Sequence, residues 1–371
     1  MKKLGFGMMR LPLLDPDDYS SVDIEAVKPL VDAFMAKGFT YFDTAAPYHG
    51  GNSEVAFREA VVKRYPRSAY TITDKLSLFM LKKPEDMPGF FSAQLERLGL
   101  DYVDYYWLHG LGEPSYRQAE AFHAFEFVQQ LKAEGKVKHI GLSFHDKAEL
   151  LDEILTKHPE MEYVQLQLNY LDWEDATVQS RLCYEAAAKH RKPVIVMEPI
   201  KGGSLVNIPQ EAQELFKTAR PDLSVASWAI RFAASPKNVM MVLSGMNTPE
   251  QMADNTSYMQ NFRLLDDEER AVIDKVASVI RNAIEIPCTA CRYCIDGCPK
   301  HIAIPDYFAI YNNLKRFGNE QNMVAMTYYG NLNKTHGKAS DCIRCGKCEA
   351  RCPQHLPIRQ YLEDVARALE K

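Results

Sequence analysis

The chain has 371 residues, 46% of them hydrophobic, so it can build one large domain and a second, smaller one. Its formal net charge is −5 and no segment carries a stripe of Lys and Arg, which argues against a nucleic-acid partner. Arg10 and Pro12 interrupt the N-terminal apolar run, and no later stretch approaches ~18 uninterrupted apolar residues. We therefore expect a soluble, cytoplasmic protein without a membrane partner.

Up to about residue 280, short apolar runs alternate with longer amphipathic segments. The runs predict strands at Leu4–Met9, Phe39–Phe42, Ala69–Leu76, Val103–Leu108, Val137–Ser143, Tyr163–Leu168, Val194–Glu198 and Val239–Leu243. The segments between them predict helices at Ile24–Lys37, Ser53–Arg64, Pro84–Leu98, Tyr116–Glu134, Lys147–Lys157, Asp175–His190, Ser224–Ala234 and Pro249–Met259. Eight strand-then-helix units are typical of an α/β fold of the (β/α)8 TIM-barrel type, here over residues 1–280.

A doubly wound sheet is the alternative fold, and it calls for a dinucleotide fingerprint after the first strand. The segment Gly5-Phe-Gly-Met-Met-Arg10 begins like G-x-G-x-x-G, but Arg10 stands where the third glycine would allow close helix packing. No Walker-type loop occurs either. If a nucleotide binds, a segment other than these two loop types must hold its phosphates.

A barrel of this kind carries its chemistry at the C-terminal ends of its strands. Polar or titratable residues lie at the ends of four of the predicted strands: Asp43 and Tyr48, Lys75, His109, and Ser143 with His145. Any one alone has an ordinary explanation as a capped turn, a packed ring or a solvated charge. Their arrival at successive strand ends favours a site.

The chemistry that these residues permit is proton transfer to a carbonyl oxygen. An ammonium beside a tyrosine stabilises the phenolate, so we expect Lys75 to lower the pKa of Tyr48 and to let it exchange a proton with an alkoxide. Asp43 would hold Lys75 charged and oriented, and His109 would position the oxygen. A nicotinamide across the barrel mouth could supply the hydride.

The segments Asp43–Tyr48, Tyr70–Lys75 and Tyr105–Gly110 resemble, in order and placement, the Asp/Tyr/Lys/His tetrad of the aldo-keto reductases. The resemblance covers about residues 1–280. It implies an oxidoreductase that uses NAD or NADP to reduce a small carbonyl substrate or oxidise an alcohol. It also implies a catalytic set made of Asp43, Lys75, His109 and Tyr48, with Tyr48 as the proton donor.

The resemblance also implies cofactor contacts at matching positions. The end of the first strand, Gly7, Met8, Met9 and Arg10, would line the nicotinamide and pyrophosphate, and Ser143 and Gln165 would bind the carboxamide. The loop with Glu198, Gly202 and Gly203 would fold over the pyrophosphate, where glycines let backbone approach an anion. Ser244, Gly245, Gln251 and Asn255 would surround the adenosine.

Two departures from the family pattern bear on nucleotide and substrate. Members that prefer the 2′-phosphate usually place Lys at the position of Gly245 and Arg at that of Gln251, so those charge-assisted contacts are missing here. NAD and NADP both stay open, and NADH is a serious candidate. Met8 and Met9 replace the more usual Thr and Trp, so the substrate cannot be read from relatives.

The C-terminal segment repeats a cysteine pattern, C-x2-C-x2-C-x3-C-P, at Cys288–Pro299 and Cys342–Pro353. In bacterial ferredoxins three thiolates of such a run hold one iron–sulfur cluster and the fourth ligates the other. We therefore predict two [4Fe-4S] clusters in a ferredoxin-type domain over residues 281–371. One would be held by Cys288, Cys291, Cys294 and Cys352, and the other by Cys342, Cys345, Cys348 and Cys298.

Zinc sites or a disulfide framework are the alternatives for these cysteines. Zinc sites usually use two C-x2-C pairs, and disulfide scaffolds belong to short secreted chains, so both fit the repeat less well. Only Cys183 lies outside the repeat, and we expect it to be a small buried apolar residue. The halves are separated by 43 residues, which predicts helical segments around Tyr307–Phe317 and a mainly α-helical variant of the domain.

Together the two parts resemble the aldo-keto reductase subgroup with a C-terminal ferredoxin domain. A nicotinamide moves two electrons as hydride whereas each cluster accepts one, so direct coupling is awkward. A flavin could split the pair, but no segment signals one. The ferredoxin part could relay electrons to a partner protein. Alternatively, the chain is an iron–sulfur electron-transfer protein whose barrel is a docking scaffold, or its clusters only brace the fold.

Overall fold

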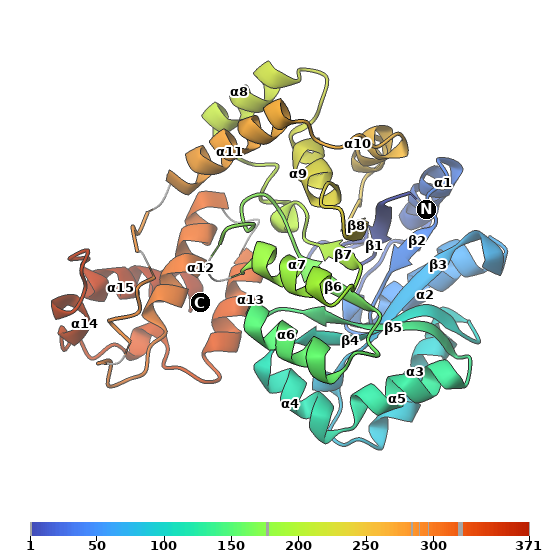
Figure 1. Ribbon diagram of the computed structural model, residues 1–371, viewed down its shortest axis with the longest axis horizontal. Helices are drawn as coiled ribbons and strands as arrows, with labels where there is room; N and C mark the ends of the chain where they lie inside the picture. The colour runs from blue at the N-terminus through green and yellow to red at the C-terminus, as the bar shows by residue number, and fades with distance from the viewer. Residues whose placement is uncertain are drawn as a thin grey trace. The chain divides into compact units, whose positions relative to one another are not determined.

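The computed structural model describes residues 2–175, 178–282, 285–288, 290–295, 297–317 and 322–370. The chain divides into two compact units (Figure 1). The first contains Met1–Ile200 and Asp222–Arg270, and the second contains Lys201–Pro221 and Ala271–Lys371. We describe each unit by itself.

The first unit is a closed barrel of eight parallel strands in sequence order, which confirms the predicted (β/α)8 fold. The barrel closes where β1 pairs with β8, with Leu4 opposite Val242. The strands are β1 (Leu4–Gly7), β2 (Tyr41–Asp43), β3 (Thr71–Leu76), β4 (Val103–Leu111), β5 (Val137–Phe144), β6 (Tyr163–Gln167), β7 (Val194–Met197) and β8 (Val239–Ser244).

Helices cover the barrel between successive strands. They are α1 (Ile24–Ala36), α2 (Asn52–Phe57), α3 (Asp86–Leu98), α4 (Glu113–Ala121), α5 (Ala124–Ala133), α6 (Ala148–Lys157), α7 (Ser180–Lys189), α9 (Val225–Ala234) and α10 (Pro249–Gln260). The segment predicted as one helix over 116–134 is two, because His123 between α4 and α5 has φ 54°. Helix α7 begins at Ser180, and residues 176–177 of the predicted helix lie outside the described residues.

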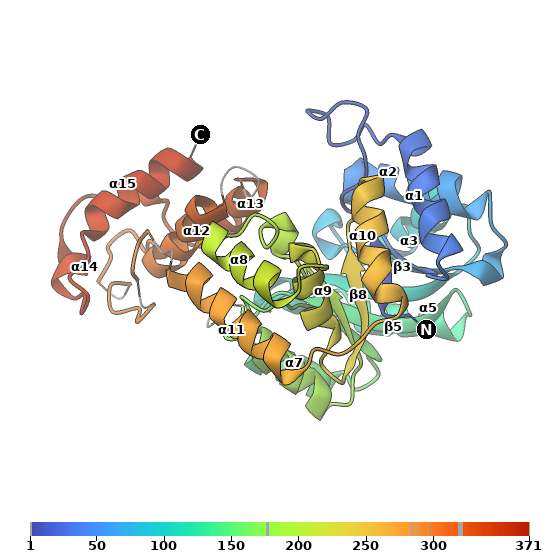
Figure 2. The ribbon, with the colours of Figure 1, turned by 90° about the horizontal axis from the view of Figure 1, so that it is seen from above.

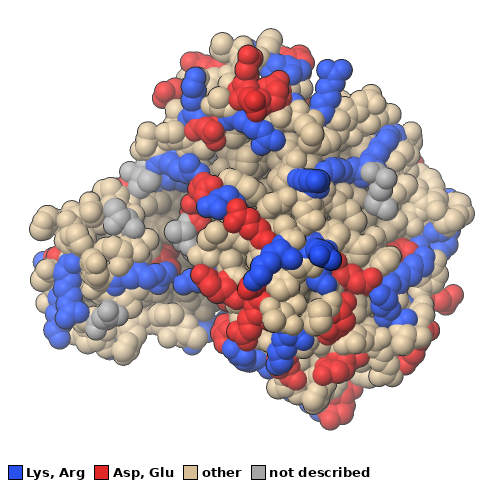
Figure 3. All heavy atoms as spheres, in the orientation of Figure 1, with Lys and Arg blue, Asp and Glu red and all other residues tan. Residues whose placement is uncertain are grey.

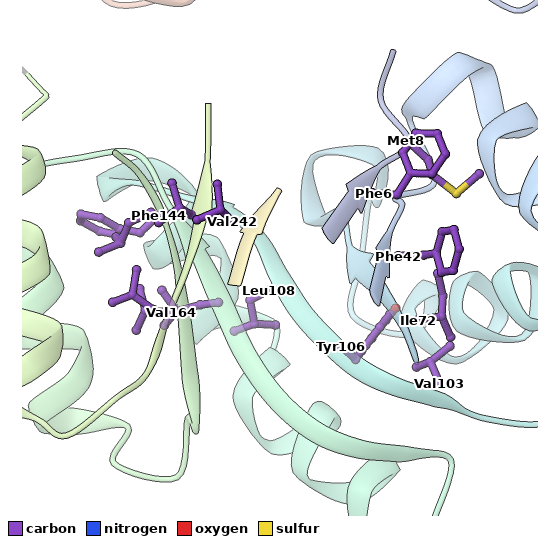
Figure 4. Close-up of a cluster of buried hydrophobic side chains, with 14 of the residues drawn as sticks. Phe6, Met8, Phe42, Ile72, Val103, Tyr106, Leu108, Phe144, Val164 and Val242 are labelled. Carbon is purple, nitrogen blue, oxygen red and sulfur yellow. The ribbon is translucent and has the colours of Figure 1, made fainter. Parts of the chain in front are cut away.

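The outward side chains of the strands form a large apolar core with the helices. Phe6, Phe42, Ile72 and Tyr106 are fully buried there, and Figure 4 shows them together with Met8. Each such side chain contributes about 1.5–3 kcal/mol by leaving water. This core fixes the strands, and the strands in turn position what lies at their ends.

The inward side chains of the strands form a separate cluster, which we call the aromatic floor: Tyr41, Tyr105, Trp107 and Tyr163. The rings of Tyr105 and Tyr163 lie 5.2 Å apart, edge to face. Gly141 makes room for them, because a Cβ there would lie 2.6 Å from the Trp107 ring and 2.4 Å from the Tyr163 carbonyl oxygen. Large rings beside a glycine thus fill the barrel beneath its mouth.

The second unit is helical within its described residues. It holds α8 (Gln210–Ala219), most of α11 (Asp267–Asn282), α12 (Ile304–Phe317), α13 (Asn322–Leu332), α14 (Lys347–Ala350) and α15 (Ile358–Leu369). Helices α8 and α11, which the sequence reasoning did not predict, lie side by side in Figures 1 and 2. Helix α12 covers the predicted helical segment and packs against α13 and α15.

Two local interactions hold the cysteine-containing segments of the second unit in place. Ile302 and Gly337 form a parallel β-bridge, and a Cβ at Gly337 would lie 2.2 Å from the Lys300 carbonyl oxygen. Only glycine permits that approach. The Asn312 side-chain amide bonds both backbone groups of Ile286, at 2.8 Å each, and so ties the segment before Cys288 to α12.

Charged side chains of both signs are distributed over the surface. On the face drawn in Figure 3, Lys and Arg mingle with Asp and Glu over most of the area. Over the described ranges, the structure contains no helix with the length and apolar character that a membrane crossing needs.

Candidate active site and cysteine-lined cavities

The mouth of the barrel receives its polar residues from the alternation of the strands. Successive strand residues point to opposite faces, so a residue two positions beyond an inward one also points inward. Asp43, His109 and Gln165 each lie two positions beyond a residue of the aromatic floor. Lys75 lies two positions beyond Thr73, which bonds Tyr41, and Ser143 lies two positions beyond Gly141, which lies against Trp107. The residues that sequence reasoning selected at the strand ends therefore share the inner face of the barrel.

Lys75 and Asp43 form a buried ion pair at this mouth. Lys75 Nζ donates to Asp43 Oδ1 at 2.5 Å and to the Thr44 carbonyl oxygen at 2.8 Å, and both charged side chains are at most 4% exposed. Gln165 Nε2 donates to the other carboxylate oxygen at 3.2 Å. Burial lowers the pKa of Lys75, but Asp43, Tyr48 and Asp74 together outweigh burial and raise this pKa overall, so the amine stays charged.

Tyr48 reaches the same ammonium from a turn after β2. Its hydroxyl lies 3.4 Å from Lys75 Nζ, which also stands 4.9 Å from the ring centre. Burial raises the pKa of Tyr48, and Lys75 opposes this rise without cancelling it. The expectation that Lys75 lowers this pKa overall is therefore wrong for this structure, because desolvation of the phenolate outweighs the ammonium. Tyr48 keeps its proton at neutral pH.

His49, the residue after Tyr48, anchors this turn. It is 1% exposed and adopts a left-handed conformation with φ 52°. Its Nε2 accepts the backbone N–H of Leu11 at 3.1 Å, so its Nδ1 carries the proton and donates to the Tyr19 carbonyl oxygen at 2.7 Å. The ring also stacks on Tyr19 at 4.4 Å. His49 thus fixes the Tyr48 turn against the loop that follows β1.

His109 completes the group, and a serine that the sequence reasoning missed supports it. The His109 and Tyr48 rings lie 5.9 Å apart and nearly perpendicular. The hydroxyl of Ser77 lies 2.7 Å from His109 Nδ1, which leaves Nε2 for a substrate. Burial, helped by the charge of Lys75, holds the pKa of His109 well below its usual value, so the ring is neutral. Ser77 was detectable, because it stands two positions beyond Lys75.

Ser143 and Gln165, the residues expected at the carboxamide, are opposite each other on β5 and β6. Both are buried. Ser143 Oγ accepts the backbone N–H of Gly110 at 2.7 Å, and Gln165 bonds Asp43. Gln165 is therefore in direct contact with the ion pair, whereas Ser143 holds the backbone near the end of β4.

The first and last strands bring four of the other expected cofactor residues together. A Cβ on Gly7 would lie 3.7 Å from the Ser244 backbone, and one on Gly245 would lie 3.4 Å from Arg10 Cβ. Met9 is 47% exposed. Met8 departs from the expectation, because its side chain is fully buried beside Phe6 and Phe42 in the core (Figure 4). A cofactor could meet Met8 only through its backbone.

The expected adenosine residues are partly engaged within the protein. Asn255 is 4% exposed, donates to Ser244 Oγ at 2.9 Å and accepts the Tyr258 hydroxyl at 2.7 Å. Gln251 is exposed at the start of α10, where its Oε1 accepts the backbone N–H of Asn247 at 3.0 Å. Both side chains shape the loop after β8.

The expected pyrophosphate loop divides between the two units. Glu198 follows β7 in a left-handed conformation, and its carbonyl oxygen accepts the Asn169 amide at 3.2 Å. Gly202 and Gly203 have φ 65° and 105° and belong to the second unit. Their role at the phosphates stays a prediction.

The eight repeat cysteines gather in two cavities of the second unit, four in each. Cys288, Cys291, Cys294 and Cys352 line the first cavity, and Cys298, Cys342, Cys345 and Cys348 line the second. These are the sets expected from a crossed ferredoxin arrangement. All the thiols are free, as is the buried Cys183.

Soft thiolate donors in fours suit an iron–sulfur cluster. In the described ranges, no three His, Cys, Asp or Glu side chains converge on one point as ligands of a single ion do. Thiolates around a cubane are spread over four irons, so they need not converge in this way. Iron ligation by the eight residues stays a prediction.

Comparison with known families agrees with the barrel and with a ferredoxin-type segment after it. The sequence model of the aldo/keto reductase family matches residues 3–278, and that of the 4Fe-4S dicluster domain matches residues 287–356. The chain belongs to the aldo/keto reductase family and carries a C-terminal 4Fe-4S dicluster domain. It is therefore an oxidoreductase.

Relatives match more than half of the chain. An NADH-specific methylglyoxal reductase of Escherichia coli strain K12 is 25% identical over 268 residues, which span 62% of this chain and 81% of that protein. An aldo-keto reductase of Mycolicibacterium vanbaalenii is 30% identical over 257 residues, which span 67% of this chain and 83% of that protein.

Solved structures share the fold. An aldo-keto reductase of Bacillus halodurans in its holo form gives a TM-score of 0.58 at 23% identity, covering 74% of this chain and 91% of that one. A Klebsiella pneumoniae aldo-keto reductase in complex with NADPH gives 0.57 at 19% identity, covering 74% and 90%. At these identities the likeness concerns the fold alone.

Proposed function

We propose that this protein reduces a small carbonyl substrate with NADH or NADPH, with Tyr48 as the proton donor. One observation carries the proposal: Lys75 Nζ lies 2.5 Å from Asp43 Oδ1 and 3.4 Å from the Tyr48 hydroxyl. The three groups form a chain from a buried carboxylate to a phenol at the barrel mouth. The reverse reaction, oxidation of an alcohol, uses the same groups.

The chain's residues handle the negative charge that develops on the carbonyl oxygen. A bound nicotinamide would supply the hydride. Tyr48 gives its proton to the oxygen, and Lys75 stabilises the phenolate that is left. Asp43 keeps Lys75 charged and aimed at Tyr48. The raised pKa of Tyr48 keeps the donor loaded at neutral pH, and the nearby ammonium limits the cost of losing the proton.

His109 positions the substrate oxygen in this proposal. Because its Nδ1 is engaged by Ser77 and its ring lies 5.9 Å from that of Tyr48, Nε2 would bind the oxygen that Tyr48 protonates. Phe79 packs 5.7 Å from the His109 ring and is 61% exposed, so an apolar substrate group can lie against it. With the Ser77 hydroxyl donating to Nδ1, the neutral His109 would carry its proton on Nε2 and donate it to the substrate oxygen without competing for the Tyr48 proton.

NADH is the nucleotide that we favour. The chain lacks a basic residue at positions 245 and 251, and Gln251 is held by Asn247. The Escherichia coli relative is described as NADH-specific, which supports the same choice. Ser143 and Gln165 would hold the carboxamide, and the glycines at the ends of β1 and β8 would admit the pyrophosphate.

The two cysteine-lined cavities would hold one [4Fe-4S] cluster each. Such a cluster exchanges single electrons, so we propose that the second unit exchanges electrons with a partner protein. The free thiols that iron binding requires suit the reducing cytoplasm, our expected location.

Replacing Tyr48 by phenylalanine tests the assignment of the donor. We expect kcat for NADH-dependent carbonyl reduction to fall about 100-fold or more, because positioned proton transfer is worth at least that factor. The dissociation constant for NADH should not change. Tyr102→Phe is the matched control, because it removes the same hydroxyl from a tyrosine outside the proposed site. Tyr102 precedes β4, and its ring lies against Arg67. Wild-type turnover by Tyr48→Phe would refute the assignment.

A further inference from the structure

The charge of the chain is divided unevenly along its length. Residues 281–371 contain 13 Lys and Arg against 9 Asp and Glu, a formal charge of +4, whereas residues 1–280 carry −9. The thiolates of two loaded clusters would cancel much of this positive charge, so an acidic protein is repelled less by the last quarter than by the rest of the chain. Figure 3 agrees, because Lys and Arg predominate on the drawn face of that segment.

The basic side chains of this segment gather around the second cavity. Lys300, Lys347 and Arg359 line it, and its lining includes no acidic residue. Arg359 is held by Glu349, with Nη2 2.6 Å from Oε2. Lys300 and Lys347 are exposed, and neither has an acidic partner among the residues that the structure describes. Two ammonium groups beside Cys298 and Cys345 are thus open to an outside anion.

The first cavity differs in this respect. Arg292 is the one basic residue in its lining, and its guanidinium is paired with Asp306 at 2.6 Å. The charge of Arg292 is therefore largely neutralised. The contrast singles out the second cavity.

An exposed apolar residue accompanies the two lysines. Ile343, next to Cys342, is 58% exposed and lines the second cavity, and Cys345 two positions further is exposed too. An apolar contact with charges at its rim is the usual anatomy of a protein interface. Here it surrounds the cysteines predicted to hold one cluster.

We propose that the surface formed by Ile343, Lys300 and Lys347 docks a small acidic protein that carries one electron. This rests on the proposed function, because it gives the second unit its electron partner. In each encounter one electron passes between the carrier and the group held by the second cysteine set, so one is oxidised as the other is reduced. No proton or covalent bond is exchanged.

The salt dependence of binding is the quantity to measure for such a contact. Transient electron-transfer complexes bury little surface, so their association depends strongly on charge. Exposed lysines are screened at a Debye length of about 10 Å in 0.1 M salt. Binding should therefore weaken steeply with added salt, and this behaviour can be recorded without any turnover.

The test uses the full-length, iron-loaded protein and an acidic plant-type [2Fe-2S] ferredoxin as the probe. We compare the dissociation constant at 20 and 200 mM salt for the wild type, for Lys300→Glu/Lys347→Glu and for Lys315→Glu/Lys334→Glu. The last pair makes the same change of charge in the same unit at exposed residues outside both linings. We expect at least about tenfold weaker binding for the first pair at low salt and about twofold or less for the control.

Iron content and NADH-dependent turnover of the same preparations separate this proposal from the proposed function. If the wild type bound no iron or showed no NADH-dependent turnover, the proposed function would be contradicted. With both intact, equal weakening by the two variants, absence of wild-type binding at 20 mM salt, or binding indifferent to salt would overturn the docking surface.

Discussion

Replacing Lys75 by methionine removes the ammonium and keeps most of the side-chain volume, so it exposes the cost of the buried charge on Asp43. The lysine and aspartate side chains are 1% and 4% exposed, so water cannot replace the lost partner. Breaking such a pair costs about 3–5 kcal/mol in unfolding free energy. The bond from Gln165 to Asp43, at 3.2 Å, remains and offsets part of this. We expect the loss to be largest at pH 8.

The loss should shrink as the pH falls. Burial already raises the pKa of Asp43, with Lys75 opposing, and removing Lys75 raises it further. A carboxyl with a raised folded-state pKa takes up its proton more readily when folded, so it favours folding at low pH and loses that contribution as the pH rises through the folded pKa. The change is at most about 1.4 kcal/mol per pH unit.

Urea unfolding followed by tryptophan fluorescence is the assay. The protein's three tryptophans, Trp107, Trp173 and Trp228, all lie in the first unit, so their signal reports the barrel separately from the second unit. The double variant Asp43→Asn/Lys75→Met should recover most of the stability, because no buried charge is left. A loss below about 1 kcal/mol at pH 8, or an equal loss at pH 8 and pH 5.5, would show that the pair is not a coupled buried pair.

Three further changes address the rest of the proposed site. Ser77→Ala should lower kcat/KM for the carbonyl about 3- to 10-fold without changing NADH affinity, because His109 loses a neutral hydrogen bond worth about 0.5–1.5 kcal/mol. Gln251→Arg should raise the ratio of kcat/KM with NADPH to that with NADH about tenfold, because a guanidinium can bind the 2′-phosphate. Cys291→Ser should lower bound iron by about half in elemental analysis, whereas Cys183→Ser should not change it.

Control variants test the explanations given for these three changes. Ser257→Ala removes an exposed hydroxyl from α10 and should leave turnover unchanged. Gln251→Leu removes the bond to Asn247 without adding charge, so an equal shift of nucleotide preference would contradict the electrostatic explanation. Full iron in Cys291→Ser would remove this cysteine from the proposed ligands.

Most of the barrel could be predicted from the sequence, because strands covered on their outer face and filled within read as apolar runs. The break at His123 could not, since no glycine, proline or asparagine marks its positive φ. Helix α8 buries only Ala212 and Phe216, which is too little periodicity to reveal it. Helix α11 buries Ile273, Val276, Ala277 and Ile280, a readable helical pattern that the division at residue 280 obscured.

The candidate site was predictable to the extent that it follows strand alternation. Asp43, Lys75 and His109 share the inner face because of their register, and their roles in catalysis stay predictions. The pKa of Tyr48 was not predictable, because it depends on how much water the folded turn excludes. The contact of Gln165 with Asp43 joins residues 122 positions apart, so it needs the closed barrel.

The closeness of Gly141 to its neighbours limits how this barrel can be reshaped. Because a Cβ there would strike the Tyr163 carbonyl oxygen as well as the indole of Trp107, position 141 is closed to every other amino acid. Of the groups that crowd position 141, Trp107 is the one side chain, and it stands two residues before His109 on the same strand. Trimming that indole would hollow out the space beneath the reacting groups, so evolution or an engineer can deepen the chamber for a bulkier substrate from this side.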